Sequence, residues 1–205
     1  MDHDDIVASC EGDFDRYGDT FLGAGWTKSE ATAEQRYDVM LDVAAGHRRF
    51  TLLDFGCGTA RLLDHAQKIG LEGMEYSGLD LSTKVLDVCR AKYPDRRFYC
   101  TDVLADDTAL PVFDYVAMNG IFHYKGEMTQ AAMLDYFGRL LTTVARHARR
   151  GVAFNVMSTH VEWERDDLFH LPLEVATDFV AENISRRFRL RHDYGLHEYT
   201  VHVHL

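Results

Sequence analysis

Short apolar runs alternate with apolar positions at helical spacing along the chain from residue 50 onward. Compact apolar runs are typical of buried strands, whereas a spacing of three to four residues is typical of helices that bury one face. We predict strands over residues 50–54, 76–81, 97–100, 113–119, 151–158, 187–192 and 198–205. We predict helices over residues 29–45, 60–69, 83–93 and 128–148, and a last one that begins near Pro172. This alternation indicates a parallel sheet covered by helices on both faces.

The last two predicted strands differ from the others, because only the turn Asp193–His197 separates them. Parallel neighbours need a crossover of about a dozen residues, so the seventh strand must run antiparallel to the sixth. The predicted fold class is α/β, a three-layer αβα sandwich around a seven-stranded, mostly parallel sheet with an antiparallel seventh strand. We expect a single domain over residues 1–205, in which residues 1–49 precede a core of residues 50–205.

The composition favours a cytoplasmic protein that acts on a small molecule. Of the 205 residues, 46% are hydrophobic, yet no apolar run reaches the ~18–20 residues that a membrane span needs. The acidic start of the chain lacks the basic residues of a secretory signal. The four cysteines form no CxxC pair, which favours reduced thiols. The net charge of −11 argues against a nucleic-acid partner, since such proteins carry a basic surface.

The stretch "LLDFGCGTARLL", residues 52–63, leads from a predicted strand through a turn into a predicted helix. Asp54 ends the strand, and Gly56 and Gly58 form the turn. Parallel α/β sheets bind ligands at the carboxyl ends of their strands, where glycine lets the backbone approach a ligand closely. Taken alone, the stretch fits a ligand site and an ordinary tight turn with a capping acid equally well.

Two further acids follow the next two predicted strands. Asp80 is placed to accept hydrogen bonds from a ribose diol, and Asp102 is placed to meet an adenine amino group. Acids avoid buried sheets, so three of them at successive strand ends favour a nucleoside site over the alternative of three solvated loops. A nicotinamide site is disfavoured, because Arg61 stands where its glycine fingerprint needs a third glycine. Because the Asp54 carboxylate would also repel a negatively charged pyrophosphate, a cationic ligand without phosphates fits better.

Together these features resemble the class I, Rossmann-like S-adenosylmethionine-dependent methyltransferases. The resemblance covers about residues 35–205 and rests on "LLDFGCGTA", "YSGLDLS", "YCTDV" and "FDYVAMNGIFHY" in that order, and on the antiparallel last strand. It implies S-adenosylmethionine as cofactor and S-adenosylhomocysteine as product. Ala60 departs from the pattern at a position where many members carry a glycine.

The same resemblance implies where the cofactor would bind. Its methionine end would lie against the first glycine turn and the end of the fourth strand, its ribose at the second strand, and its adenine between the second and third strands. The residues implied are Asp54, Gly56, Cys57 and Gly58 for the methionine end, Asp80 for the ribose, Leu81, Asp102 and Val103 for the adenine, and Asn119 and Gly120 for the methionine amino group.

A looser resemblance extends toward the N-terminus. The segments "YGDTFLGAGW" and "EQRYDVML" are similar to the lead-in of small bacterial methyltransferases that act on metabolites or glycan precursors, where this part tends to cover the cofactor. Tyr17, Trp26 and Arg36 are then expected over the methionine carboxylate, with Arg36 as its ion partner. The alternative is that Tyr17 and Trp26 pack the N-terminal helix onto the sheet.

The methyl acceptor is the least determined part of the site. A neutral amine needs only its lone pair, whereas a hydroxyl benefits from a base whose pKa is near neutral, such as histidine. His123, in "NGIFHYKG", is the first candidate, with Tyr124 beside it. His160 is a further catalytic candidate in the polar segment "STHVEWERDDLFH", which also contains Glu162, Trp163, Asp166 and His170 and whose acids and aromatic residue would suit a cationic substrate. Each of these residues is also consistent with a solvated loop.

Two other kinds of site are disfavoured. The alternation in the C-terminal "HEYTVHVHL" is what a half-buried strand produces, and no cysteine lies near to complete a zinc site, so we predict no metal. Amino-methyltransferases that act on nucleic-acid bases carry an Asn/Asp-Pro-Pro-aromatic run after the fourth strand. This chain has Asn119-Gly120-Ile121-Phe122 there.

We therefore expect a methyltransferase that acts on a hydroxyl or amine of a small molecule, as a monomer or a homodimer. An aminopropyl transferase on the same fold is an alternative, although it would need a paired acid where Asn119 stands. A non-catalytic nucleotide-binding subunit is another alternative that the sequence leaves open.

Overall fold

A computed structural model describes residues 4–26 and 29–205. Its helices are α1 (Asp4–Tyr17), α2 (Glu30–Leu41), the 3-10 turn η1 (Asp42–Ala44), α3 (Arg61–Lys68), α4 (Thr83–Lys92), α5 (Gln130–Ala145) and α6 (Leu173–Asn183). Its strands are β1 (Phe50–Phe55), β2 (Met74–Leu79), β3 (Arg97–Tyr99), β4 (Phe113–Phe122), β5 (Ala148–Ser158), β6 (His170–Leu171), β7 (Phe188–Arg191) and β8 (Glu198–His204).

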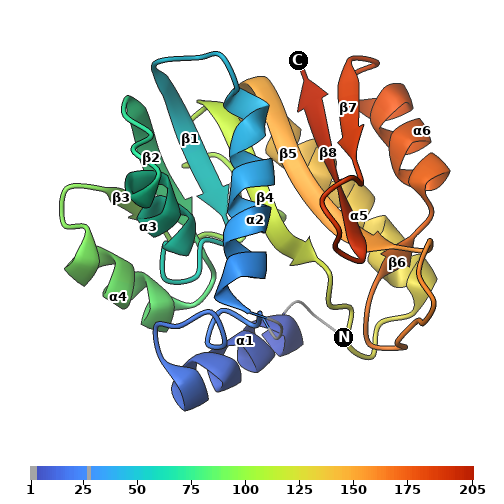
Figure 1. Ribbon diagram of the computed structural model, residues 1–205, viewed down its shortest axis with the longest axis horizontal. Coiled ribbons are helices and arrows are strands. Elements are labelled where there is room, and N and C mark those ends of the chain that lie inside the picture. The colour runs from blue at the N-terminus through green and yellow to red at the C-terminus, as the bar shows by residue number, and fades with distance from the viewer. Residues whose placement is uncertain (1–3, 27–28) are drawn as a thin grey trace.

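The strands form one mixed sheet in the order β3-β2-β1-β4-β5-β8-β7. Strands β1 to β5 run parallel to one another, and β8 runs antiparallel to both β5 and β7 (Figure 1). The predicted parallel sheet and the antiparallel last strand are thereby confirmed. The sheet also contains β6, which pairs with β5 beside the main order. We did not predict this strand, because two residues carry no readable periodicity.

Two apolar clusters, one on each face of the sheet, make the three layers. Alternate residues of a strand point to opposite faces, so Leu52 joins one cluster and Leu53 the other. Helices α2, α3 and α4 bury their apolar residues on the face of Leu52, and α5 and α6 on the face of Leu53. At the start of α4 the Ser82 hydroxyl caps the helix by accepting a hydrogen bond from the backbone amide of Val85.

Helix α1 and the start of strand β5 differ from the prediction. Helix α1 was not predicted, because its sequence is mostly polar and acidic and shows no clear apolar stripe. Strand β5 begins at Ala148 rather than at Gly151, which lies inside it. A β-carbon at Gly151 would meet the Val203 carbonyl oxygen at 2.6 Å, so the glycine lets two strands approach and does not start one.

Strand β8 is buried on both faces, and the expected half-buried strand is therefore wrong. Its polar face lies beneath α2 and η1, and His202 and Thr200 are at most 1% exposed. The His202 Nε2 lies 2.7 Å from the Val39 carbonyl oxygen, and its Nδ1 accepts from Arg189. The polar residues of this strand are thus satisfied by buried hydrogen bonds, which an alternating pattern cannot distinguish from solvent exposure.

Candidate functional site

One cavity of about 530 Å³ runs along the edge of the sheet at which β1, β2, β4 and β5 end. Because β8 is antiparallel, its first residue, Glu198, lies at the same edge and is paired with Met157 near the end of β5. Helix α1 lies across this edge of the sheet, below the arrowheads of β1 and β4 (Figure 1). Side chains from α1 therefore close one side of the cavity.

The turn after β1 is shaped by backbone that only glycine adopts easily. Gly56 and Gly58 have φ of +73° and +51°, in the left-handed region. A β-carbon at Gly56 would come within 2.2 Å of Ile121 Cδ1. The Leu79 carbonyl oxygen accepts from the Gly56 and Cys57 amides, which ties this turn to the end of β2. Gly56, Cys57 and Gly58 all line the cavity.

The three carboxylates predicted to converge all line this cavity. Asp54 is buried and accepts a hydrogen bond of 2.8 Å from the Tyr76 hydroxyl, and burial raises its pKa to about 7. The Asp80 carboxylate accepts from the Gly58 amide at 2.9 Å and the Ser82 amide at 3.0 Å, while burial raises its pKa. Asp102 accepts from the Leu104 amide at 2.9 Å. The edge thus presents fixed hydrogen-bond acceptors.

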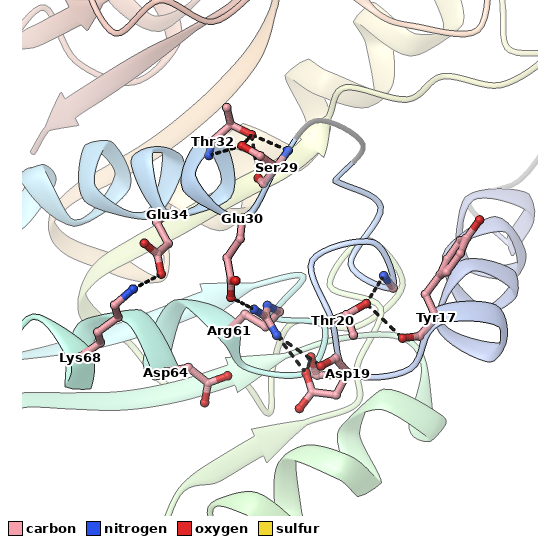
Figure 2. Close-up of polar contacts among 12 residues, drawn as sticks. Tyr17, Asp19, Thr20, Ser29, Glu30, Thr32, Glu34, Arg61, Asp64 and Lys68 are labelled. Carbon is pink, nitrogen blue, oxygen red and sulfur yellow. Dashed lines mark hydrogen bonds and ion pairs between the residues drawn. The ribbon is translucent and has the colours of Figure 1, made fainter.

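The segment between α1 and α2 is held beside the cavity by ion pairs. Figure 2 shows Arg61, the first residue of α3, reaching Asp19 and Glu30. Lys92 pairs with Asp19 from α4 at 2.9 Å. The segment places Trp26 in the lining, where a β-carbon at Gly120 would come within 2.8 Å of Trp26 Cη2. Trp26 therefore packs directly over the end of β4.

The predicted residues Tyr17 and His160 lie outside the lining of the cavity, as do Glu162, Asp166 and His170. Tyr17 ends α1 with 41% of its surface exposed, and its ring points away from the polar contacts of the segment (Figure 2). His160 is exposed in the turn after β5, where its ring faces His192 at 6.3 Å. Neither side chain is placed to touch a molecule in this cavity.

Arg36 lines the cavity, but it already has an ion partner from the chain. Its Nη2 lies 2.6 Å from Glu198 Oε2, its Nε donates to both carboxylate oxygens, and its guanidinium lies 4.4 Å from the Trp26 ring centre. Pairing of Arg36 with a ligand carboxylate stays a prediction, and such a ligand would share the guanidinium with Glu198. Glu198 lies 162 positions after Arg36 and in a different element, so no local spacing in the sequence relates the two residues.

Glu198 is the functional candidate that sequence reasoning missed. It is 1% exposed and also accepts from Asn155 Nδ2 at 2.8 Å. The same Asn155 amide donates to Asn119 Oδ1, and its oxygen accepts from the Gly120 amide at 2.7 Å. A signal was present: an acid at the start of an antiparallel last strand must lie at the ligand edge.

His123 lies against this cluster and lines the cavity with Tyr124. Its Nε2 is buried without a hydrogen-bond partner among the described residues, 3.8 Å from Glu198 Oε2. Burial lowers its pKa below 6.5, with nearby Glu198 opposing the shift, so the imidazole is neutral at pH 7. A neutral imidazole beside a buried carboxylate can accept a proton and hold it.

The remaining predicted cofactor residues line the cavity along the same edge of the sheet. Strand β4 continues through Phe122, beyond the predicted end at Asn119, with an irregular register between Met118 and Phe122. Such an irregularity turns backbone groups out of the sheet. The cavity is lined by Asn119 and Gly120 from this irregular stretch and by Leu81 and Val103 beyond β2 and β3.

Comparisons with known proteins relate the chain to methyltransferases. The family described as "Methyltransferase domain" matches residues 53–147. Rv1506c of Mycobacterium tuberculosis, which is provisionally named a methyltransferase, is 26% identical to this chain over 159 residues. The matched residues cover 75% of this chain and 92% of that protein.

Solved structures share the fold at low sequence identity. Magnesium protoporphyrin IX methyltransferase from Synechocystis, solved with bound S-adenosylmethionine, superposes with a TM-score of 0.69 at 16% identity, covering 100% of this chain and 97% of that one. The 1,6-didemethyltoxoflavin-N1-methyltransferase from Burkholderia thailandensis gives a TM-score of 0.66 at 16% identity, covering 98% of this chain and 86% of that one.

Proposed function

We propose that this chain is a class I methyltransferase that transfers the methyl group of S-adenosylmethionine to a hydroxyl or amine of a small molecule, leaving S-adenosylhomocysteine. The methyltransferase-domain match and the shared fold support this proposal, in agreement with the resemblance found in the sequence. One observation carries the assignment of the cofactor: Asp54, Asp80 and Asp102, which end or follow three different strands, line one cavity.

The residues of this edge fit an adenosyl cation. Asp80 has a carboxylate fixed by two backbone amides, which suits two ribose hydroxyls, and Asp102 and Val103 are in position for an adenine edge against Leu81. Asp54 forms no ion pair with any described residue. Burial raises its pKa to about 7, which disfavours the ionised form, and a nearby cation would favour that form again. A positively charged ligand at the β1 and β4 ends therefore completes this site.

When bound, S-adenosylmethionine supplies an electrophilic methyl group and its own leaving group. The chain then has to orient the acceptor and to take its proton. Positioning of the reacting atoms contributes several kcal/mol to such displacements, about 7–11 in the best cases. His123 is neutral and faces the cavity, so it is the base in this proposal, with Tyr124 beside it to orient the acceptor.

The proposed substrate is a small molecule, and the proposed oligomeric state is a monomer or a homodimer. The net charge of −11 supports an acceptor other than a nucleic acid. A cytoplasmic location is supported by four cysteines that are all free thiols. Among residues 4–26 and 29–205, no helix is long and apolar enough to cross a bilayer.

Methyl-labelled S-adenosylmethionine tests the proposed reaction directly. The purified chain is incubated with the labelled cofactor and, separately, with a low-molecular-mass cell extract, a protein fraction or an RNA fraction. We expect label to enter the small-molecule fraction. Label that enters only protein or RNA, or none of the three, would contradict the proposal.

A further inference from the structure

The cavity has two halves that differ in the chemistry of their walls. Asp54, Asp80 and Asp102 lie toward β1, β2 and β3, which form one side of the sheet. The other half lies at β4, β5 and β8, where His123 and Glu198 are found. If the cofactor occupies the first half, as proposed above, the second half is where the methyl acceptor binds.

Charged groups in this second half neutralise one another. Arg36 pairs with Glu198, and Arg165 forms a two-pronged pair with Asp167. The acids Glu162 and Asp166, which the sequence offered for a cationic substrate, do not line the cavity. Each charge in the lining of this half therefore already has its counterion within the described part of the chain. A charged acceptor would find no free partner here, so a neutral one is favoured.

Aromatic rings make up much of the wall. Trp163 and Tyr124 line the cavity, although 41% and 37% of their surfaces are exposed. Trp26 closes the side next to His123, and the centres of these two rings are 5.9 Å apart. The Trp163 ring is held by His197 at 5.2 Å. Large exposed aromatic rings inside a concave site are typical of surfaces that stack flat ligands.

The two walls that carry these rings are fixed to each other. Tyr124 forms a β-bridge with Leu168, and the His123 carbonyl oxygen accepts from the Phe169 amide at 2.8 Å. The Asp167 carbonyl oxygen accepts from the Lys125 amide at 2.9 Å. Tyr124 and the segment that carries Trp163 are therefore held next to each other before any ligand binds, which lowers the entropic cost of stacking a rigid ligand.

The polar floor of this half can accept a proton. The His123 Nε2 lies 3.8 Å from Glu198 Oε2 and has no hydrogen-bond partner in the described structure. A proton taken up by the imidazole is stabilised by this carboxylate, which Arg36 and Asn155 hold in place. An acceptor that carries an acidic O–H or N–H suits this floor, whereas an amine that already has a free lone pair gains nothing from it.

We propose that the acceptor is a neutral, flat aromatic compound with a phenolic hydroxyl or a ring N–H. It stacks against Trp163 and Tyr124 with its acidic hydrogen toward His123. As the acceptor O–H or N–H bond breaks, its proton passes to His123 while the freed electron pair forms the new bond to the methyl carbon. The sulfur–methyl bond breaks with its electrons left on sulfur, so the products are the methylated aromatic compound and S-adenosylhomocysteine. This inference rests on the proposed function.

Probe binding to the protein saturated with S-adenosylhomocysteine tests the inference. Calorimetry with 2-naphthol, cyclohexanol and spermidine compares a flat phenol, a non-planar hydroxyl and a polyamine. We expect 2-naphthol to bind at least tenfold more tightly than either of the others. Equal or tighter binding of cyclohexanol or spermidine would overturn the inference. If S-adenosylhomocysteine itself fails to bind, the proposed function fails instead.

Two matched variants locate the probe. Trp163→Leu should weaken 2-naphthol binding at least tenfold and leave S-adenosylhomocysteine affinity within twofold. Tyr17→Leu is the control, because Tyr17 is equally exposed but lies outside the lining. The chain has two tryptophans, Trp26 and Trp163, and both line the cavity, so both indole N–H signals should shift when the probe binds. Unmoved signals, or equal losses in the two variants, would place the aromatic ligand elsewhere.

Discussion

Arg36 of α2 and Glu198 of β8 form a buried ion pair that joins the second helix to the last strand across the floor of the cavity. The two groups are 2.6 Å apart, and their side chains are 11% and 1% exposed. Two charges removed from water in this way stabilise a fold only when both are present and fully hydrogen-bonded. The pair therefore makes the cavity dependent on contact between distant parts of the chain.

Removing one partner of this pair should destabilise the protein strongly. Glu198→Gln leaves the Arg36 guanidinium buried without a counterion, and we expect the free energy of unfolding to fall by about 3–5 kcal/mol. The double variant Arg36→Met/Glu198→Gln should recover part of that loss, because no unpaired charge remains. Urea unfolding of the wild type, the single variants Arg36→Met and Glu198→Gln, and the double variant measures the coupling. Additive losses in the double variant would mean that the two side chains do not interact.

His123 should act on the reaction and not on cofactor binding. With a hydroxyl acceptor, we expect His123→Ala to lower turnover about 100-fold or more while the affinity for S-adenosylhomocysteine is unchanged. Burial holds the pKa of His123 below 6.5, and the base must be neutral. The wild-type rate should therefore fall only as the pH drops through a value below 6.5, as kcat/KM measured against pH will show. An unchanged rate in the variant would remove His123 as the base.

A side chain at Gly56 should disturb the lining of the cavity. Gly56→Ala introduces a β-carbon 2.2 Å from Ile121 Cδ1, so the Ile121 side chain, which lines the cavity, must move, and we expect at least a tenfold loss of S-adenosylhomocysteine affinity. Gly70→Ala is the matched control, because its φ of +71° is nearly the same as +73° at Gly56 but no atom lies within 4 Å. Both variants lose about 1–2 kcal/mol to left-handed backbone. Equal affinities for the two would show that the space at Gly56 is immaterial.

His202 should make stability depend on pH. Burial lowers its pKa to about 4, so the unfolded chain binds more protons than the native one between pH 4 and 6.5, and stability is lost as the pH falls through that window. Asp54 acts in the opposite sense: its pKa of about 7 gives stability that is present below pH 4 and lost as the pH rises toward 7. The two effects partly cancel in the wild type.

Comparison with His202→Gln isolates the histidine. We expect the unfolding free energy of the wild type, relative to this variant, to fall by about 1–2 kcal/mol between pH 7 and pH 5. Urea unfolding at several pH values measures the difference. A difference that stays constant across this range would show that His202 does not titrate on unfolding.

The fold and the convergence of three strand-end carboxylates on one cavity were predictable because local pattern determines them. Parallel strands end at a common edge, so Asp54, Asp80 and Asp102 could be placed together from their positions after three strands. The acceptor half was not predictable in the same way. Glu198 becomes part of it only through the pairing of β8 with β5, and Arg36 is occupied by that same residue. Contacts between residues so far apart in the sequence leave no local signal.

The position of His160 shows the same limit. A histidine after a strand end resembles a site residue in the sequence, yet the turn directs it away from the cavity, whereas Trp163, farther along the same segment, lines it. Side-chain direction within a long loop depends on tertiary contacts, such as the bridge between Tyr124 and Leu168. Periodicity does not record such contacts.

Calorimetric titration with S-adenosylhomocysteine tests most directly whether three strand-end carboxylates build one nucleotide site. We expect saturable binding by the wild type and a loss of about 1–3 kcal/mol in Asp80→Ala, which removes the acceptor of the ribose hydrogen bonds. Asp87→Ala, on the exposed surface of α4, should bind as the wild type does. A wild type that does not bind the nucleotide, or an Asp80→Ala variant with undiminished affinity, would contradict the account.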